Sequence, residues 1–173
     1  DIARYGSDET VYIIIEVNRN NLADVIFIRS TKKMPLTDTI GRIKQLNQLF
    51  DFKAVYIDES GIGGGVIDSL AESNVRIRNL DGEIGGITFT LQNKEIMYKN
   101  LKLLMEQKRL RIPNHEKMIN QLLNLRVEYT EAGHLKIHHS ERGHDDYPDA
   151  LALACIGVMR KRIGRIALGG RRV

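Results

Sequence analysis

Acidic residues gather at three places in this 173-residue chain. Asp1 opens the segment Asp-Ile-Ala-Arg-Tyr-Gly, and Asp58 ends the apolar run Val-Tyr-Ile-Asp. The third group, Asp145, Asp146 and Asp149, lies just ahead of an apolar stretch. Phosphodiester hydrolysis by two metal ions needs such carboxylates, because they hold two divalent cations about 3.5–4 Å apart. Mg²⁺ prefers these oxygen ligands, so the three groups together suit a divalent-metal site.

Each group also has a purely structural interpretation. An Asp at the end of a strand is commonly a turn or cap residue. Acids ahead of a helix favour the positive end of its dipole. Asp149 lies three residues after Asp146 and four after Asp145, so either pair can face one site on a helix. The spacing therefore leaves the choice between Asp145 and Asp146 open, and His144 is both an accessory candidate and an ordinary surface histidine.

The strands expected to position these acids are rich in β-branched and aromatic residues. Residues 10–17 and 23–30 predict two strands of a hairpin that turns at Asn18, Asn20 and Asn21. Shorter strands are predicted over 54–58, ending at Asp58, and over 75–78. Residues 126–130 and 134–139 predict a second hairpin that turns at Ala132-Gly133.

The helices are predicted from apolar residues at helical spacing. The first begins at Thr37 or Asp38 as its cap and carries an apolar stripe, and others span 66–72 and 93–108. A further helix is capped by Asn114, and the last runs from Asp149 to about residue 162 with Pro148 in its first turn. Strands mixed with helices in this order predict an α/β fold in which helices flank a mixed β-sheet.

Composition restricts the class of protein. Hydrophobic residues make up 42% and charged residues 28%, which indicates one ordinary globular domain over 1–173. No apolar run approaches the roughly 20 residues of a membrane span, so we expect no membrane partner. The single cysteine, Cys155, lies among apolar residues and is expected in the core. One cysteine cannot form an internal disulfide, which suits a reducing compartment.

Basic residues give the chain a net charge of +4 and gather in two regions. One region is Lys99, Lys102, Lys108, Arg109, Arg111 and Lys117, and the other is Arg160, Lys161, Arg162, Arg165, Arg171 and Arg172. Either region alone is equally an ordinary solvated helix face. A basic domain that also carries acidic groups suggests a polyanionic partner that is bound through metal ions.

Three segments carry a resemblance to a known family. They are Asp1-Ile-Ala-Arg-Tyr-Gly-Ser-Asp8, Tyr56-Ile-Asp-Glu-Ser-Gly-Ile-Gly-Gly-Gly65 and His144-Asp-Asp-Tyr-Pro-Asp-Ala-Leu-Ala-Leu-Ala154. Over almost its whole length, the chain resembles the nuclease domain of bacteriophage large terminase subunits. The resemblance also includes the middle segments Asn93-Lys-Glu-Ile-Met-Tyr, Arg109-Leu-Arg-Ile-Pro113 and Leu122-Leu-Asn-Leu-Arg126. The third segment is the most specific.

This resemblance implies an RNase H-like fold and a metal-dependent endonuclease that cuts double-stranded DNA concatemers during genome packaging. Asp1 would be the first-strand carboxylate and Asp58 the second, with Asp149 and either Asp145 or Asp146 as the third. Two Mg²⁺ or Mn²⁺ ions, the portal protein and the small terminase subunit are the implied cofactors and partners. The implied location is the packaging motor at the procapsid portal in the host cytoplasm.

The family also implies an ATPase motor ahead of this domain, so we expect the chain to be a fragment. It contains no Gly-x-x-x-x-Gly-Lys-Ser/Thr loop, and no ATPase activity is assigned to it. Residues 61–65 are better interpreted as a tight strand-to-helix turn.

Two other functions remain open from the sequence: an RNase H-like Holliday-junction resolvase and a DNA-binding module without catalysis. Cleavage of branched DNA would favour the first, and metal-dependent plasmid nicking would exclude the second. Contacts to DNA phosphates are expected from Arg109, Arg111, Lys136, His138 and His139.

Overall fold

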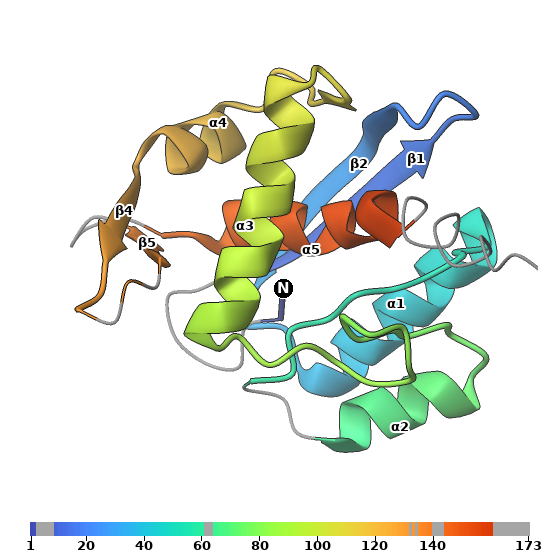
Figure 1. Cartoon of the computed structure of the whole chain (residues 1–173). Helices are drawn as coiled ribbons and strands as arrows, with labels where there is room; N and C mark the ends of the chain where they lie inside the picture. The colour runs from blue at the N-terminus through green and yellow to red at the C-terminus, as the bar shows by residue number, and fades with distance from the viewer. Residues whose placement is uncertain (3–8, 61–63, 132, 134, 140–143, 161–173) are drawn as a thin grey trace, which may run out of the picture.

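A mixed three-stranded sheet forms the centre of the molecule, seen in the computed structural model of residues 1–2, 9–60, 64–131, 133, 135–139 and 144–160 (Figure 1). Strand β1 (Glu9–Val17) pairs antiparallel with β2 (Ala23–Lys32), and β2 pairs parallel with the short β3 (Leu110–Arg111). The Asn18 side chain accepts hydrogen bonds from the backbone N–H groups of Asn20 and Leu22, which shapes the turn between β1 and β2. The predicted hairpin and mixed sheet are confirmed.

Strand β1 is covered on both faces. Tyr12 and Ile14 belong to one buried cluster, which also includes residues of α1 (Leu36–Phe50) and α2 (Gly64–Glu72). Val11, Ile13 and Ile15 pack into a second cluster with α3 (Leu91–Glu106), α4 (Glu116–Leu123) and α5 (Asp146–Arg160). Because successive strand residues point to opposite faces, this alternation places helices on both sides of the sheet. The α/β fold predicted from the sequence is confirmed.

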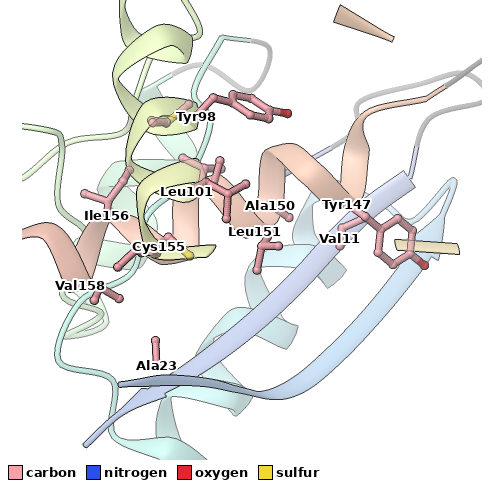
Figure 2. Close-up of a cluster of buried hydrophobic side chains, with 14 of the residues drawn as sticks. Val11, Ala23, Tyr98, Leu101, Tyr147, Ala150, Leu151, Cys155, Ile156 and Val158 are labelled. Atoms are coloured by element: carbon pink, nitrogen blue, oxygen red, sulfur yellow. The ribbon is translucent and has the colours of Figure 1, made fainter. Parts of the chain in front are cut away.

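Helix α5 lies across the sheet and forms the centre of the larger cluster. Its residues Leu151, Cys155 and Ile156 are completely buried (Figure 2). Leu101 and Tyr98 approach them from α3. Cys155 is therefore the core residue that its apolar neighbours predict. The packing fixes α3 and α5 relative to each other, and both carry polar residues at the ends that face residues 1 and 58.

All five helix starts among the described residues differ from the sequence prediction. Helices α2 and α3 each begin two residues earlier than predicted, at Gly64 and Leu91. Helix α1 begins at Leu36 after Pro35, without a side-chain cap from Thr37 or Asp38, because the Pro35 carbonyl accepts the backbone N–H of Asp38. Helix α4 is capped by His115 rather than Asn114. The His115 ring nitrogen Nδ1 accepts the backbone N–H of Met118 at 3.2 Å.

The last helix begins three residues earlier than predicted, at Asp146 instead of Asp149. The carbonyl of Asp145 accepts the backbone N–H of Asp149 at 2.8 Å, which extends the helical pattern forward. Pro148 therefore lies within the first turn, as predicted. This shift places Asp146 and Asp149 together in that turn.

The two short strands predicted over 54–58 and 75–78 are reduced to single bridge pairs. Val55 pairs with Ile77, and Asp58 pairs with Ile87, both in parallel orientation. A cavity of about 590 Å³ separates much of segment 52–57 from β1, and Asp1 is among its lining residues. The segment therefore forms no extended ladder, and Ile57 instead packs in the buried cluster that contains Tyr12 and Ile14.

The second hairpin is confirmed. Strands β4 (Leu125–Tyr129) and β5 (Leu135–His139) form a separate two-stranded sheet, and Gly133 in the turn has a φ of 80° that suits glycine. No helix in the described part of the chain is long and apolar enough to cross a membrane.

Candidate active site

Asp149 is a buried carboxylate whose two oxygens are both held by side chains of another helix. Its Oδ1 accepts a 2.7 Å hydrogen bond from the Tyr98 hydroxyl, and its Oδ2 lies 2.8 Å from the Lys94 ammonium. Lys94 and Tyr98 are four residues apart, so they lie on the same face of α3. Helix α3 therefore holds both oxygens of Asp149 in fixed directions.

Burial and charge shift the pKa values of these three groups. Burial raises the pKa of Asp149 to about 6, although the neighbouring Lys94 charge acts in the opposite direction. Burial lowers the pKa of Lys94, but the charges of Asp149 and Asp145 outweigh burial, so that pKa lies above its usual value. Burial also raises the pKa of Tyr98, and the adjacent Asp149 charge raises it further. Tyr98 therefore stays protonated and donates its hydrogen bond.

Asp145 and Asp146 face different neighbours. The Oδ2 of Asp145 lies 3.2 Å from the same Lys94 ammonium that contacts Asp149. Asp146 is buried in the first turn of α5, and its charge acts on the backbone nitrogen of Asp1. Asp145 thus contacts α3, whereas the charge of Asp146 acts on Asp1. The arrangement leaves both as candidate ligands, as the sequence did.

Asp1 lies beside β1. Its backbone nitrogen and carbonyl both bond to Val11, at 3.1 and 2.9 Å, as in an antiparallel strand pair. The charges of Asp58, Asp149 and Asp146 all act on this backbone nitrogen. All three acidic groups are therefore within electrostatic reach of one backbone atom.

Asp58 is held by its own loop. Its Oδ1 accepts hydrogen bonds from the backbone N–H of Ser60 at 2.9 Å and from the Ser60 hydroxyl at 2.6 Å. Ser60 Oγ in turn accepts the N–H of Phe89 at 2.8 Å, which ties this loop to the segment before α3.

Gly86 is needed where this segment passes the loop. A Cβ added at Gly86 would lie 2.6 Å from the Cβ of Glu59, closer than side chains approach. Glu59 also accepts hydrogen bonds from the Gly86 N–H and the Thr88 hydroxyl. The close passage positions the bridge pair between Asp58 and Ile87.

The carboxylates at this point suit a hard divalent cation, because their oxygens are the ligands that Mg²⁺ and Mn²⁺ prefer. As they stand, however, several of these oxygens are bonded to Lys94, Tyr98 and Ser60. Accordingly, no three Asp, Glu, His or Cys side chains among the described residues are arranged to hold a metal ion. The donor set fits a metal, provided that protein donors give way to it.

The family of the chain is decided by a match to the family model described as the terminase RNase H-like domain, over residues 6–156. The chain belongs to this family. The match includes Asp58, Asp145, Asp146 and Asp149, and Asp1 lies outside it. The resemblance inferred from the three sequence segments is confirmed.

Similar proteins agree with this assignment. The terminase large subunit of Thermus phage G20c is 29% identical over 149 residues, which are 86% of this chain and 29% of that protein. The large subunit of Thermus virus P23-45 is 25% identical over 152 residues, 88% of this chain and 30% of that protein. This terminase domain thus spans about three tenths of the length of these curated relatives.

A solved structure of the large terminase nuclease from phage G20c with bound magnesium has a TM-score of 0.65 to this chain at 23% identity. The alignment covers 87% of this chain and 82% of that one. At this identity the likeness establishes the fold, which is RNase H-like as predicted.

Strand β5 of the terminase domain lies next to the acids. The Glu95 side chain, adjacent to Lys94 on α3, accepts the backbone N–H of Leu135 at 3.3 Å. Lys136 follows on β5 and is exposed. The rings of His139 and the exposed His144 lie 6.5 Å apart, and His138 pairs with Glu128 across the hairpin. The hairpin is thus attached to the first part of α3 through Glu95, and His139 lies beside His144, which precedes Asp145 in the chain.

Arg109 and Arg111 lie elsewhere. The Arg109 guanidinium donates to the backbone carbonyl of Asn21, and that of Arg111 pairs with Asp24. Asp24 faces Glu16 on β1, five residues beyond Val11, where Asp1 pairs. At about 3.4 Å per residue this separation is roughly 17 Å. The structure does not bring these arginines to the acids. Lys161 to Arg172 lie outside the described residues.

Sequence reasoning assigned no role to Lys94 or Tyr98, although both belong to a segment that carried the resemblance. A usable signal was present. Lys94, Tyr98 and Leu101 continue the buried face of α3 at helical spacing, so a lysine and a tyrosine extend an apolar stripe toward one end. A charged residue at such a position needs a buried partner of opposite charge.

Proposed function

We propose that this domain is a divalent-metal-dependent endonuclease that cuts double-stranded DNA concatemers during viral genome packaging. The observation that carries the proposal is that Asp58, Asp146 and Asp149 lie within electrostatic reach of the Asp1 backbone, in a chain of the terminase RNase H-like family. Those carboxylates come from separate segments and are buried or half-buried. A fold gains no stability from crowding like charges, so their convergence supports a function.

The metal ligands in this proposal are Asp1, Asp58, Asp149 and one or both of Asp145 and Asp146. Two Mg²⁺ or Mn²⁺ ions, when bound, supply an activated water and stabilise the leaving oxygen. The solved G20c nuclease structures with bound magnesium, cobalt and zinc support a divalent cation. Within this chain, α3 orients Asp149 through Tyr98, and the Ser60 loop orients Asp58.

The full protein is proposed to carry an ATPase motor ahead of this domain. It is further proposed to work with the portal protein and the small terminase subunit at the procapsid, in the host cytoplasm. These parts of the proposal rest on the family and on the greater length of the curated relatives.

Plasmid cleavage tests the activity directly. The purified chain is incubated with supercoiled plasmid in Mg²⁺, in Mn²⁺ and in EDTA, and nicked and linear products are measured. We expect cleavage with either ion and none in EDTA. Cleavage restricted to branched duplexes would support a junction resolvase instead. DNA binding without cleavage in any metal would indicate a non-catalytic module.

A further inference from the structure

The Lys94 ammonium contacts two carboxylates of the third acidic group at once. It lies 2.8 Å from Asp149 Oδ2 and 3.2 Å from Asp145 Oδ2, and its side chain is only 18% exposed. The ion pair therefore lies largely out of water, where its geometry matters more than that of a surface pair. It also crosses between α3 and α5, two elements that meet although they are far apart in the sequence.

Lys94 and Tyr98 bind different oxygens of Asp149. Tyr98 donates to Oδ1, and Lys94 contacts Oδ2 together with the matching oxygen of Asp145. The tyrosine therefore orients one carboxylate, whereas the lysine bridges two. A bridging position between two carboxylate oxygens is also the position that a cation ligated by both of them takes.

Charge distinguishes Lys94 from such a cation. One positive charge faces the two negative charges of Asp145 and Asp149, with Asp146 in the same helical turn. A divalent ion in contact with the same oxygens supplies twice the charge. Without any cation, the two carboxylates repel each other and Asp149 is buried unpaired.

We propose that Lys94 is a positioning residue that keeps Asp145 and Asp149 in place before metal binds, and that it competes with the metal for their oxygens. The inference rests on the proposed function of this site. Lysine suits the task, because its single charge sits on a flexible four-carbon stem and can withdraw without moving the helix. The Lys94 ammonium also lies over the face of the Phe89 ring, 5.1 Å from its centroid, and this ring can hold the charge when the ammonium leaves the carboxylates.

The test compares Lys94→Met with Tyr98→Phe, and uses Lys102→Met as the matched control. Lys102 is also on α3, but its side chain is 77% exposed and pairs with Glu106 within the helix. Melting temperature is measured in EDTA, and Mn²⁺ affinity is measured by calorimetry without DNA. Both readouts are independent of cleavage.

We expect Lys94→Met to lower the melting temperature in EDTA by about 4 °C or more and to tighten Mn²⁺ binding at least threefold. Mn²⁺ then raises the melting temperature more in the variant than in the unaltered chain, because tighter ligands stabilise more at equal concentration. Tyr98→Phe lowers the melting temperature without tightening Mn²⁺ binding. Lys102→Met changes neither quantity.

Unchanged or weaker Mn²⁺ binding in Lys94→Met would overturn the inference, because a purely structural ion pair does not compete with the metal. Should that variant not fold, Lys94→Arg replaces it. The arginine guanidinium holds two carboxylates more firmly than the lysine ammonium does, so Mn²⁺ should bind Lys94→Arg more weakly than the unaltered chain. Equal or tighter Mn²⁺ binding would contradict the proposal. An unaltered chain that neither binds Mn²⁺ nor cuts DNA would overturn the proposed function as well. If the unaltered chain binds Mn²⁺ and cuts DNA but Lys94→Met does not tighten Mn²⁺ binding, only the proposed role of Lys94 is wrong.

Discussion

Glu9 and Asp149 are both buried carboxylates paired with lysine, yet their surroundings differ in charge. Glu9, at the start of β1, has two lysines against its Oε1, Lys117 at 2.5 Å and Lys32 at 3.1 Å. Although burial opposes them, their hydrogen bonds lower the pKa of Glu9 to about 2. Asp149 shares its single lysine with Asp145, and burial raises its pKa to about 6.

This difference is the one we expect between a structural carboxylate and a metal ligand. Two cations more than neutralise Glu9, so a further cation gains nothing there. Around Asp149, by contrast, two carboxylates share one lysine, which leaves an excess of negative charge. A bound divalent ion would neutralise this excess. Burial alone therefore does not identify a site in this protein. The balance of acidic and basic groups in contact with the buried carboxylate is the better guide.

The largest expected effect comes from removing the charge of Asp149, and removing the charge of Glu9 provides the comparison. We expect Asp149→Asn to reduce metal-dependent plasmid cleavage more than about 100-fold, because the amide cannot replace a charged metal ligand. The amide still accepts the Tyr98 hydrogen bond, so the fold is retained. Initial cleavage rates in Mg²⁺, with melting temperature as a check of folding, provide the measurement.

Glu9→Gln is the matched control for that experiment. It removes the same charge from an equally buried position. We expect its cleavage rate to stay within about threefold of the unaltered chain, since hydrolysis by two metal ions needs no carboxylate at that position. A loss of cleavage in Glu9→Gln equal to that in Asp149→Asn would mean that both regions act in catalysis, and the distinction between them would be wrong.

Asp58 extends the comparison to a carboxylate held by a loop. We expect Asp58→Asn to lose cleavage about 100-fold or more if the carboxylate holds metal. The melting temperature should stay close to that of the unaltered chain, because an asparagine oxygen can still accept both Ser60 hydrogen bonds. Plasmid nicking and melting are measured on the same preparation. A large fall in melting temperature would show that Asp58 is structural.

Stability as a function of pH gives a smaller effect with a definite sign. The pKa of Glu9 is lowered from 4.5 to about 2, so its contribution to stability is present above about pH 4.5 and is lost as pH falls toward 2. We expect Glu9→Gln to destabilise the domain by about 1 kcal/mol at pH 7, because Lys32 and Lys117 are largely exposed and water screens their charges. The cost must shrink below pH 4.5. Urea unfolding of both proteins from about pH 3 to about pH 7 measures it, and a constant cost would contradict the assignment.

The sequence predicted the elements better than their pairing. Strands β1 and β2 were predictable from their runs of β-branched residues, and helix α3 from Met97, Leu101 and Leu104 at helical spacing. The capping residue of α4 was not predictable, since Asn114 is the stronger cap by type and His115 takes the role through its position. The bridge pair of Asp58 depends on Ile87, a contact that no local pattern reveals.

The candidate site was likewise predictable in part. Asp residues at the end of an apolar run and ahead of an apolar helix carry a local signal, and the sequence therefore predicts them as candidate ligands. Lys94 and Tyr98 contact Asp149, which lies 51 residues beyond Tyr98, so these contacts follow only from the packing of α3 on α5. Positioning residues of this kind depend on tertiary contacts, whereas ligand candidates follow from residue type.

The smallest expected effect concerns how the domain holds DNA, and it compares Lys136 with Arg111. Lysine and arginine contacts to phosphate provide affinity without reading bases. Lys136 is exposed on β5, whose first residue bonds to Glu95 beside Lys94, whereas Arg111 is paired with Asp24 and lies further along the sheet. We expect Lys136→Gln to weaken duplex binding a few-fold and Arg111→Gln to weaken it less.

Binding of several unrelated duplexes over a salt series, with Ca²⁺ in place of Mg²⁺, measures this difference without cleavage. One lost phosphate contact should lower the slope of log affinity against log salt by about one in Lys136→Gln, equally for every sequence. The slope should remain near that of the unaltered chain in Arg111→Gln. A larger effect of Arg111→Gln would indicate that DNA binds near β3. The prediction that the duplex lies beside the β4–β5 hairpin would then be wrong. A preference for one sequence that persists at high salt would instead show that the domain reads bases, because phosphate contacts alone lose their strength as salt rises.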